Sequence, residues 1–197
     1  MHVWDILDDM TGRTHVAAGS LLLATAELVD PNFAHTVVLV LDVDDDGVLG
    51  VVLNRPSPVP VAEVLAPWGA LCAEPEVFFR GGPVSPDGAL AVALLHDDGD
   101  VPVGFRTVTG RLGMVDLDTP VELVDGGLGE MRVYAGYAGW GRAQLDAEIA
   151  EGSWYVVAGE SADAFRADTT DLWREVMRRQ PGQLSWHVTR PADPDLN

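Results

Sequence analysis

The chain has 197 residues, with 31 acidic and 12 basic side chains and a formal net charge of −19. Such an acidic surface repels nucleic-acid phosphates, which disfavours direct DNA binding. All twelve basic residues are arginine, so a Schiff-base lysine, a Walker A lysine and a Ser-Lys dyad are excluded. Hydrophobic residues make up 47% of the chain and no repeat or linker divides it, which predicts a single domain over residues 1–197.

The sequence favours a cytoplasmic location without membrane contact. Residues 1–10 contain aspartates and no basic residue, unlike a secretory signal. No apolar run reaches the roughly 20 residues that cross a bilayer. The single cysteine, Cys72, excludes an internal disulfide and fits a reducing compartment, and its apolar neighbours indicate ordinary packing.

Runs of apolar and β-branched residues, separated by turn signals, predict the strands. In chain order these are residues 20–24, 36–43, 48–53, 77–79, 89–95, 132–137 and 154–158. Asp44-Asp45-Asp46-Gly47 predicts a hairpin between the second and third, and Gly81-Gly82-Pro83 a turn between the fourth and fifth. Hairpins outnumber regular strand–helix alternation, so the predicted class is α+β with a mixed, mainly antiparallel sheet.

Helices are predicted outside these runs. Three of them are residues 60–66, 119–124 and 170–179, ended by Pro67, Gly126-Gly127 and Pro181-Gly182 respectively. The last carries Arg174, Arg178 and Arg179 near its C-terminus, where the helix dipole favours cations. With Glu175 beside them, these arginines are expected to be structural.

A glycine-aromatic knot is the most informative part of the chain. Glycines at 136, 139 and 141 permit positive φ angles or close backbone approach. Tyr137 and Trp140 supply large apolar area between them. This combination predicts a special backbone with a largely buried Trp140.

An amphipathic helix is predicted directly after the knot. Leu145 and Ile149 are four residues apart and form its apolar stripe, and Gly152 stands at the C′ position that ends it. Gln144 and Glu148 share a neighbouring face. They either act together on a partner or form a solvated polar face.

Three blocks of the sequence resemble the AlgH/YqgE family of bacterial proteins. They are Gly19–Ala24 with Asp30-Pro31-Asn32-Phe33 and Gly50–Pro56, then Val77–Val84, then Gly136–Trp154. The blocks stand in family order over residues 19–154, and residues 160–197 are expected to form a C-terminal helix and tail. The resemblance implies a sheet curled toward a barrel with helices packed outside. Members are often labelled transcriptional regulators, and the resemblance implies no particular reaction.

In the acidic run Asp42–Gly47, the residues Asp42-Val43-Asp44 depart from the family, in which many members read Glu-His-Asn at this place. Its pattern also matches the opening of a calcium loop, but the twelfth position is Leu53 instead of a bidentate glutamate. We therefore expect an acidic hairpin tip and no metal site. A second departure, Ala143 in place of glycine, is compatible with a helix.

The best candidate site is an anion-accepting surface at two strand ends. Asn54 and Arg55 precede a proline, and Arg80 precedes Gly81 and Gly82, whose N–H groups could form an anion-binding nest. Guanidinium groups bind carboxylate or phosphate in bidentate fashion. The alternative is an internal pair between each arginine and one of the many carboxylates.

Four residues of the knot and its helix complete the candidate ligand site. They are Tyr137, Trp140, Gln144 and Glu148, expected to line one concave pocket together with Asn54, Arg55 and Arg80. No catalytic residue set stands out, because histidines do not pair at metal-ligand spacing and H-E-x-x-H, G-x-S-x-G and C-x-x-C are missing.

The sequence predicts a binding or regulatory module for a small anionic ligand or a protein partner, without a cofactor. One alternative is a hydrolase with residues gathered from separate strands. Another is a transcriptional regulator, as the family label suggests, although the acidic charge disfavours direct DNA contact.

Overall fold

The computed structural model describes residues 15–97 and 99–180. Its strands are β1 (Ser20–Ala24), β2 (Val37–Val43), β3 (Val48–Val52), β4 (Pro56–Pro60), β5 (Val77–Arg80), β6 (Val84–Leu95), β7 (Phe105–Thr109), β8 (Leu112–Val115), β9 (Leu128–Trp140) and β10 (Trp154–Ala158). Its helices are α2 (Val61–Val64), α3 (Ala66–Gly69), α4 (Arg142–Ala150) and α5 (Leu172–Arg178), with 3₁₀ turns η1 (Val121–Leu123), η2 (Asp125–Gly127) and η3 (Ser161–Phe165).

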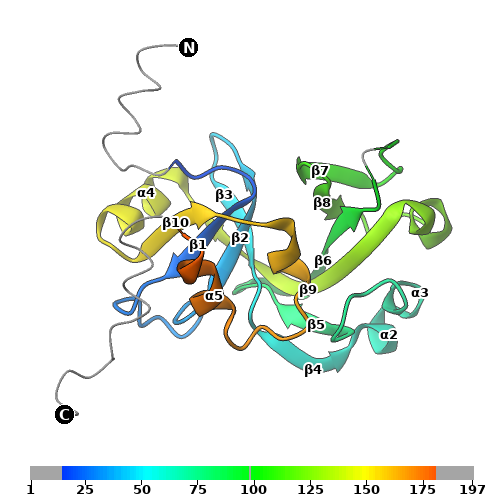
Figure 1. The fold of residues 1–197 in the computed structure, drawn as a ribbon, viewed down its shortest axis with the longest axis horizontal. Coiled ribbons are helices and arrows are strands. Elements are labelled where there is room, and N and C mark those ends of the chain that lie inside the picture. The colour runs from blue at the N-terminus through cyan, green and yellow to red at the C-terminus, as the bar shows by residue number, and fades with distance from the viewer. Residues whose placement is uncertain (1–14, 98, 181–197) are drawn as a thin grey trace.

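One curled, mainly antiparallel sheet dominates the fold (Figure 1). Its strand order is β10-β1-β2-β3-β9-β6-β8-β7, and β5 joins it by parallel pairing with β9. Asp42 of β2 nevertheless reaches Arg106 of the edge strand β7, with Oδ2 and Nη1 2.9 Å apart. Gly19, next to β1, lies so close to β7 that a Cβ there would sit 2.6 Å from a methyl carbon of Thr109. The sheet therefore bends into a half-barrel, which confirms the predicted α+β class.

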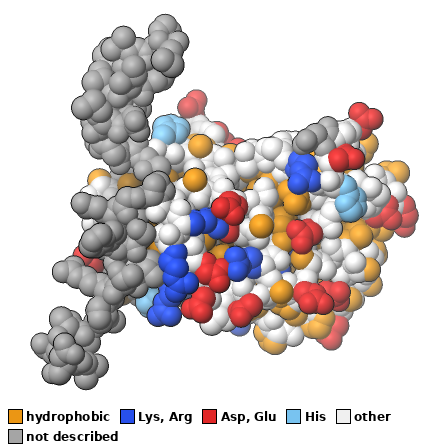
Figure 2. Space-filling view, viewed as in Figure 1, with side chains coloured by type: hydrophobic (Ala, Val, Ile, Leu, Met, Phe, Trp, Pro, Cys, Tyr) orange, Lys and Arg blue, Asp and Glu red, His pale blue; other side chains and the backbone are white. Residues whose placement is uncertain are grey.

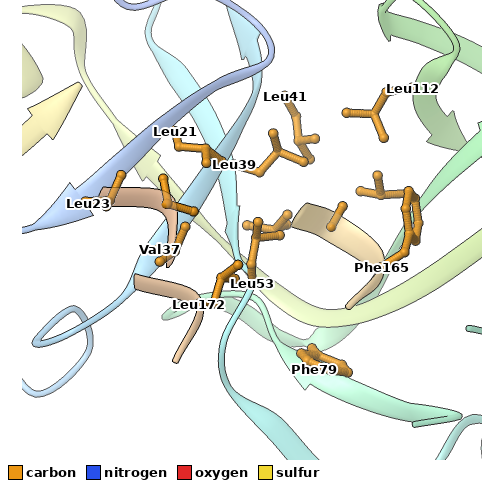
Figure 3. Close-up of a cluster of buried hydrophobic side chains, with 14 of the residues drawn as sticks. Leu21, Leu23, Val37, Leu39, Leu41, Leu53, Phe79, Leu112, Phe165 and Leu172 are labelled. Atoms are coloured by element: carbon orange, nitrogen blue, oxygen red, sulfur yellow. The ribbon is translucent and has the colours of Figure 1, made fainter. Parts of the chain in front are cut away.

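Three groups of buried side chains fill the space on the two faces of this sheet. The largest lies inside the curl, where β1, β2, β3, β5, β6, β8 and β9 face η3 and α5 (Figure 3). Leu21 and Leu39 come from β1 and β2, Leu53 directly follows β3, and Phe165 and Leu172 come from η3 and α5. The outer face packs against α4 at one end and against the α2–α3 region at the other. Burial on both faces explains the near-continuous apolar runs of β1 and β2.

The strands predicted at 20–24 and 154–158 are confirmed to the residue, and β1 pairs with β10 along its whole length. The segment Asp44–Gly47 forms the predicted hairpin tip, where Asp44 Oδ1 accepts the amides of Asp46 and Gly47, both at 2.9 Å. A single aspartate thus stabilises the turn through its own side chain.

Other element predictions need correction. Pro67 does not end the region's helical structure, because it stands at the second position of α3, where a missing N–H costs nothing. The two strands around Gly81-Gly82-Pro83 do not pair with each other; β5 and β6 both pair with β9. Strands β4, β7 and β8 were not predicted, and β9 is longer than the predicted strand at residues 132–137.

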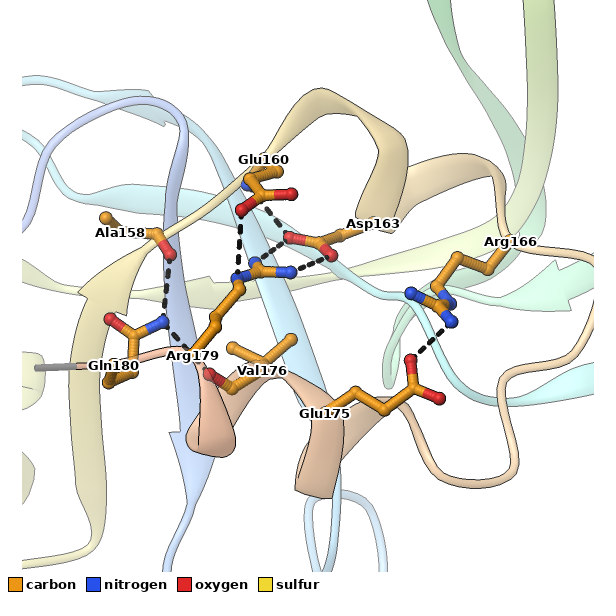
Figure 4. A network of polar contacts seen from close by, with 8 residues as sticks. All are labelled: Ala158, Glu160, Asp163, Arg166, Glu175, Val176, Arg179 and Gln180. Carbon is orange, nitrogen blue, oxygen red and sulfur yellow. Dashed lines mark hydrogen bonds and ion pairs between the residues drawn. The ribbon is translucent and has the colours of Figure 1, made fainter. Parts of the chain in front are cut away.

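Polar contacts join α5 to η3 and the residues beside it (Figure 4). The guanidinium of Arg179 donates two hydrogen bonds to the buried carboxylate of Asp163. These bonds raise the pKa of Arg179. Its Nε lies 3.4 Å from Glu160, and Arg166 pairs with Glu175. Arg174 pairs with Asp171 at 3.4 Å. Arg179 therefore has the expected structural role, whereas Arg174 makes only an exposed contact and Glu175 pairs with Arg166. The predicted helix stop at Pro181-Gly182 lies outside the described residues.

Candidate functional site

Arg55 and Arg80 lie next to each other where strands end. Arg80 is the last residue of β5, and Arg55 immediately precedes β4. The backbone N–H of Arg80 donates to the carbonyl of Arg55 at 2.8 Å, in line with the antiparallel pairing of Pro56 with Phe79. Pairing of two strand ends thus brings together two arginines that are 25 positions apart in the sequence.

The charges of this pair are not neutralised by contact. Within residues 15–97 and 99–180, neither guanidinium forms an ion pair, and the exposed Arg80 side chain makes no hydrogen bond. The pKa of Arg55 is lowered, first by burial and then by the positive charge of Arg80, while Asp30 acts in the opposite direction. The internal arginine–carboxylate pair that the sequence left open is not formed here.

A loop before β2 holds Arg55 in place. Arg55 Nη2 donates to the carbonyl of Ala34 at 3.2 Å. The side chain of Asn54 accepts the amide of Val37 at 3.0 Å and donates to the carbonyl of His35 at 2.9 Å. His35 has a left-handed backbone, with φ of 60°, which is uncommon outside glycine. Asn54 is therefore a positioning residue that ties the loop to the strand end.

Gly81 and Gly82 allow close packing against β9, and they do not form the predicted anion-binding nest with both N–H groups free. The Gly81 N–H donates to the carbonyl of Ala135 at 2.9 Å, so it is not free for an anion. A Cβ on Gly81 would lie 2.2 Å from the carbonyl oxygen of Gly136, and one on Gly82 would lie 2.3 Å from the backbone of Tyr137. The glycines are needed because this turn crosses directly over β9.

Trp140, Gln144 and Glu148 belong to a second, separate cluster. Glu148 Oε2 accepts the indole N–H of Trp140 at 3.1 Å and that of Trp154 at 2.8 Å, and Oε1 accepts the Gln144 amide at 2.9 Å. The two indole rings meet edge to face at 5.7 Å, and Phe33 lies against both. Gln144 is thus hydrogen-bonded to Glu148, which in turn binds both tryptophans. Trp140 is buried, as predicted.

The helix beneath this cluster ends as predicted. Leu145 is buried and Ile149 packs beside it against the outer face of the sheet. Gly152 takes a φ of 85°, its N–H donates to the carbonyl of Ile149 at 3.0 Å, and the Ser153 N–H donates to that of Glu148 at 2.9 Å. These two bonds form a Schellman motif, for which glycine at C′ is preferred.

Tyr137 belongs to neither group and lines a hollow of about 450 Å³ at the mouth of the half-barrel. Residues from β6, β7, β8 and β9 line it, among them Leu90, Arg106 and Met114. Asn54, Arg55, Arg80, Trp140 and Gln144 are not among the lining residues. The expected single pocket is therefore divided into an arginine pair, a tryptophan cluster and a hollow.

Arg132, which is buried, has a structural role that the sequence did not indicate. This side chain is only 1% exposed and donates to the carbonyls of Glu74, Ala164 and Arg166, at 2.6, 3.0 and 3.0 Å. Its guanidinium carbon also lies 4.2 Å from the centre of the Phe79 ring. Arg132 therefore joins the C-terminal segment to the sheet, and only its position in a strand hinted at burial.

The described part of the chain contains neither a group of side chains placed to bind a metal ion nor a reactive thiol. No three His, Cys, Asp or Glu side chains there are placed to hold a metal ion. Burial raises the pKa of the Cys72 thiol to about 11, which keeps it protonated near neutral pH.

On the face shown in Figure 2, arginine side chains lie among acidic ones, as the excess of carboxylates would suggest. Arg111, Arg132, Arg142 and Arg178 of the described residues also lack an ion pair. What distinguishes Arg55 and Arg80 is that they form a pair at neighbouring strand ends, and this pair has no contacting carboxylate. It is the strongest candidate for a functional site in the described residues.

The sequence profile of the AlgH-like family, DUF179, matches residues 21–185. The chain belongs to the AlgH-like family. UPF0301 proteins from Streptomyces avermitilis and Streptomyces coelicolor are 51% and 50% identical to it over 193 residues, which cover 95% of this chain and 100% of each relative. The resemblance inferred from the three sequence blocks is thereby confirmed.

Solved structures of the family share the fold. Protein DIP2367 from Corynebacterium diphtheriae superposes with a TM-score of 0.85 at 29% identity, covering 93% of this chain and 97% of that one. The AlgH protein from Pseudomonas aeruginosa superposes with a TM-score of 0.66 at 26% identity, covering 89% and 95%. Among the described residues, no helix combines the length and apolar character that crossing a membrane requires.

Proposed function

We propose that this AlgH-like protein is a cytoplasmic binding or regulatory module that takes a small anionic ligand between Arg55 and Arg80. The observation that carries the proposal is the arginine pair itself. Two guanidinium groups at neighbouring strand ends repel each other and have no contacting carboxylate among the described residues. An anion between them would relieve that repulsion.

The chemistry of the pair limits the ligand class. Each guanidinium offers a planar fork of donors that matches the oxygens of a carboxylate, sulfate or phosphate. Arg80 is exposed and free to turn toward a ligand, whereas Arg55 is held through Ala34. One fixed and one adjustable donor would suit a small oxyanion, or the acidic side chain of a protein partner that supplies the same group.

A thermal-unfolding experiment tests the proposal. Sulfate, phosphate and succinate should raise the melting temperature with concentration, beyond the effect of sodium chloride at equal ionic strength. Arg80→Ala should abolish this rise at a cost of at most about 1 kcal/mol in intrinsic stability, because the side chain is solvent-facing.

Arg174→Ala is the matched control. It also removes one exposed arginine charge, but from α5, so it should retain the response to anions. An equal response in wild type, Arg80→Ala and Arg174→Ala would show that the anions act through general charge screening, and the proposal would fail.

A further inference from the structure

A second site is suggested by the hollow at the mouth of the half-barrel, which does not involve the arginine pair. It has a volume of about 450 Å³ and an apolar floor that includes Leu90, Met114 and Val115. Binding sites for small molecules are typically concave and apolar, with a few placed polar groups. The polar groups here are Arg106, Tyr137, Ser85 and Asp116.

Arg106 is the cation of this hollow, and it is held by a contact that a ligand could replace. Its Nη1 donates to Asp42 Oδ2 at 2.9 Å, and its Nη2 lies 3.9 Å from the sulfur of Met114. The Arg106 and Asp42 side chains are 55% and 41% exposed. Such an exposed ion pair is weak, so an incoming carboxylate can compete with Asp42 for the guanidinium.

The remaining polar groups fit the same ligand. Tyr137 and Ser85 form no side-chain hydrogen bond with the rest of the described chain, so their hydroxyl groups are available. The one carboxylate that lines the hollow, Asp116, accepts the backbone N–H of Asp118 at 3.0 Å, which holds it at its own turn.

Backbone strain gathers at the same place. Ser85 is one of the two non-glycine residues with positive φ in the described chain, at 46°. Gly136 and Gly104, which also line the hollow, take φ angles of 70° and 81°, which glycine adopts without strain. The positive φ of Ser85 is a conformation that persists where the surroundings impose it, and such residues often occur at binding sites.

We infer that this hollow binds a small carboxylate with an apolar body. The carboxylate takes the place of Asp42 on Arg106, and the apolar body lies over Leu90 and Met114. Asp42 acts as an internal competitor for the ligand's charged group.

Isothermal titration calorimetry with octanoate tests the inference. Octanoate should bind saturably to the wild type, while acetate lacks the apolar body and 1-octanol lacks the charge, so both should bind at least tenfold more weakly. Arg106→Gln should weaken octanoate binding at least tenfold. Asp42→Asn should strengthen it several-fold, because the competing charge is removed while the side-chain shape is kept.

Two controls separate this site from the arginine pair and from net charge. Arg174→Gln makes the same charge change as Arg106→Gln on the opposite part of the fold and should leave octanoate binding unchanged. Arg80→Ala should also leave it unchanged, so failure of the proposed anion site and failure of this one are distinguishable. The inference is overturned if 1-octanol binds as tightly as octanoate, if Arg106→Gln and Arg174→Gln behave alike, or if Asp42→Asn weakens binding.

Discussion

The Glu148 carboxylate accepts the indole N–H of Trp154 at 2.8 Å, and the same oxygen accepts the indole N–H of Trp140. One glutamate on α4 therefore binds two tryptophans, one at the end of β9 and one at the start of β10, although β1, β2 and β3 lie between these strands in the sheet. The Gly-Trp, Gln, Glu and Gly-x-Trp elements of the third sequence block thus meet in one structural cluster. Its residues are explained by packing and hydrogen bonding, without any ligand.

Glu148→Ala should destabilise the protein by about 2–4 kcal/mol, because two indole N–H groups lose their acceptor. Glu148→Gln should cost less than about 1 kcal/mol, since its amide oxygen can still accept both. Glu151→Ala, an exposed change at the end of the same helix, is the control and should be nearly neutral. Urea unfolding measures all three. Equal losses for Glu148→Ala and Glu148→Gln would mean that the negative charge, and not the acceptor, matters.

Trp140→Ala should cost about 3–5 kcal/mol, because the ring is only 5% exposed and packs against Phe33 and Trp154. Denaturant unfolding followed by far-UV circular dichroism gives the value. A loss under 1 kcal/mol would show that the neighbouring rings close the space or that the residue is exposed in solution.

Stability should fall as the pH rises above about 9. Burial raises the pKa of Cys72 from 9.0 to about 11. Between these values the unfolded chain has lost the thiol proton and the folded chain retains it, so the free energy of unfolding decreases with pH. Tyr134, whose pKa burial also raises, adds to the decrease above about pH 10.

Cys72→Ala tests the assignment of this alkaline loss. The variant should show a flatter dependence of the free energy of unfolding on pH between 9 and 10 than the wild type. The same slope in both proteins would place the titrating group elsewhere.

Direct DNA binding should not occur. With a formal charge of −19, we expect no saturable binding to duplex DNA near 150 mM salt. Fluorescence anisotropy with a labelled duplex checks this. Submicromolar affinity with a steep dependence on salt would contradict the electrostatic argument.

Local patterns in the sequence predicted much of this structure. The strands at 20–24 and 154–158, the Asp44–Gly47 hairpin and the glycine end of α4 follow from rules that act over a few residues. The strands β7 and β8 were missed because their alternation is weak, with Phe105 and Leu112 as their most buried members.

Long-range pairing could not be predicted in the same way. The sequence predicted two strands on either side of the Gly81-Gly82-Pro83 turn, but it did not show that β5 and β6 both pair with β9, because this pairing depends on contacts about 50 residues away. The same limitation affected the site. Arg55 and Arg80, two of the candidate residues, lie side by side in the structure. The sequence could not show that Trp140 and Gln144 are hydrogen-bonded to Glu148, nor that Arg106 reaches Asp42 across the curl.

The most direct test of the proposed function is a nuclear magnetic resonance titration of ¹⁵N-labelled protein with sodium sulfate at constant ionic strength. We predict saturable shifts of the Nε–Hε signals of Arg55 and Arg80, together with the backbone amide of Gly82, while the Nε–Hε signal of Arg174 stays in place. Absent shifts at Arg55 and Arg80, or equal shifts at Arg174, would contradict an anion site between the two arginines.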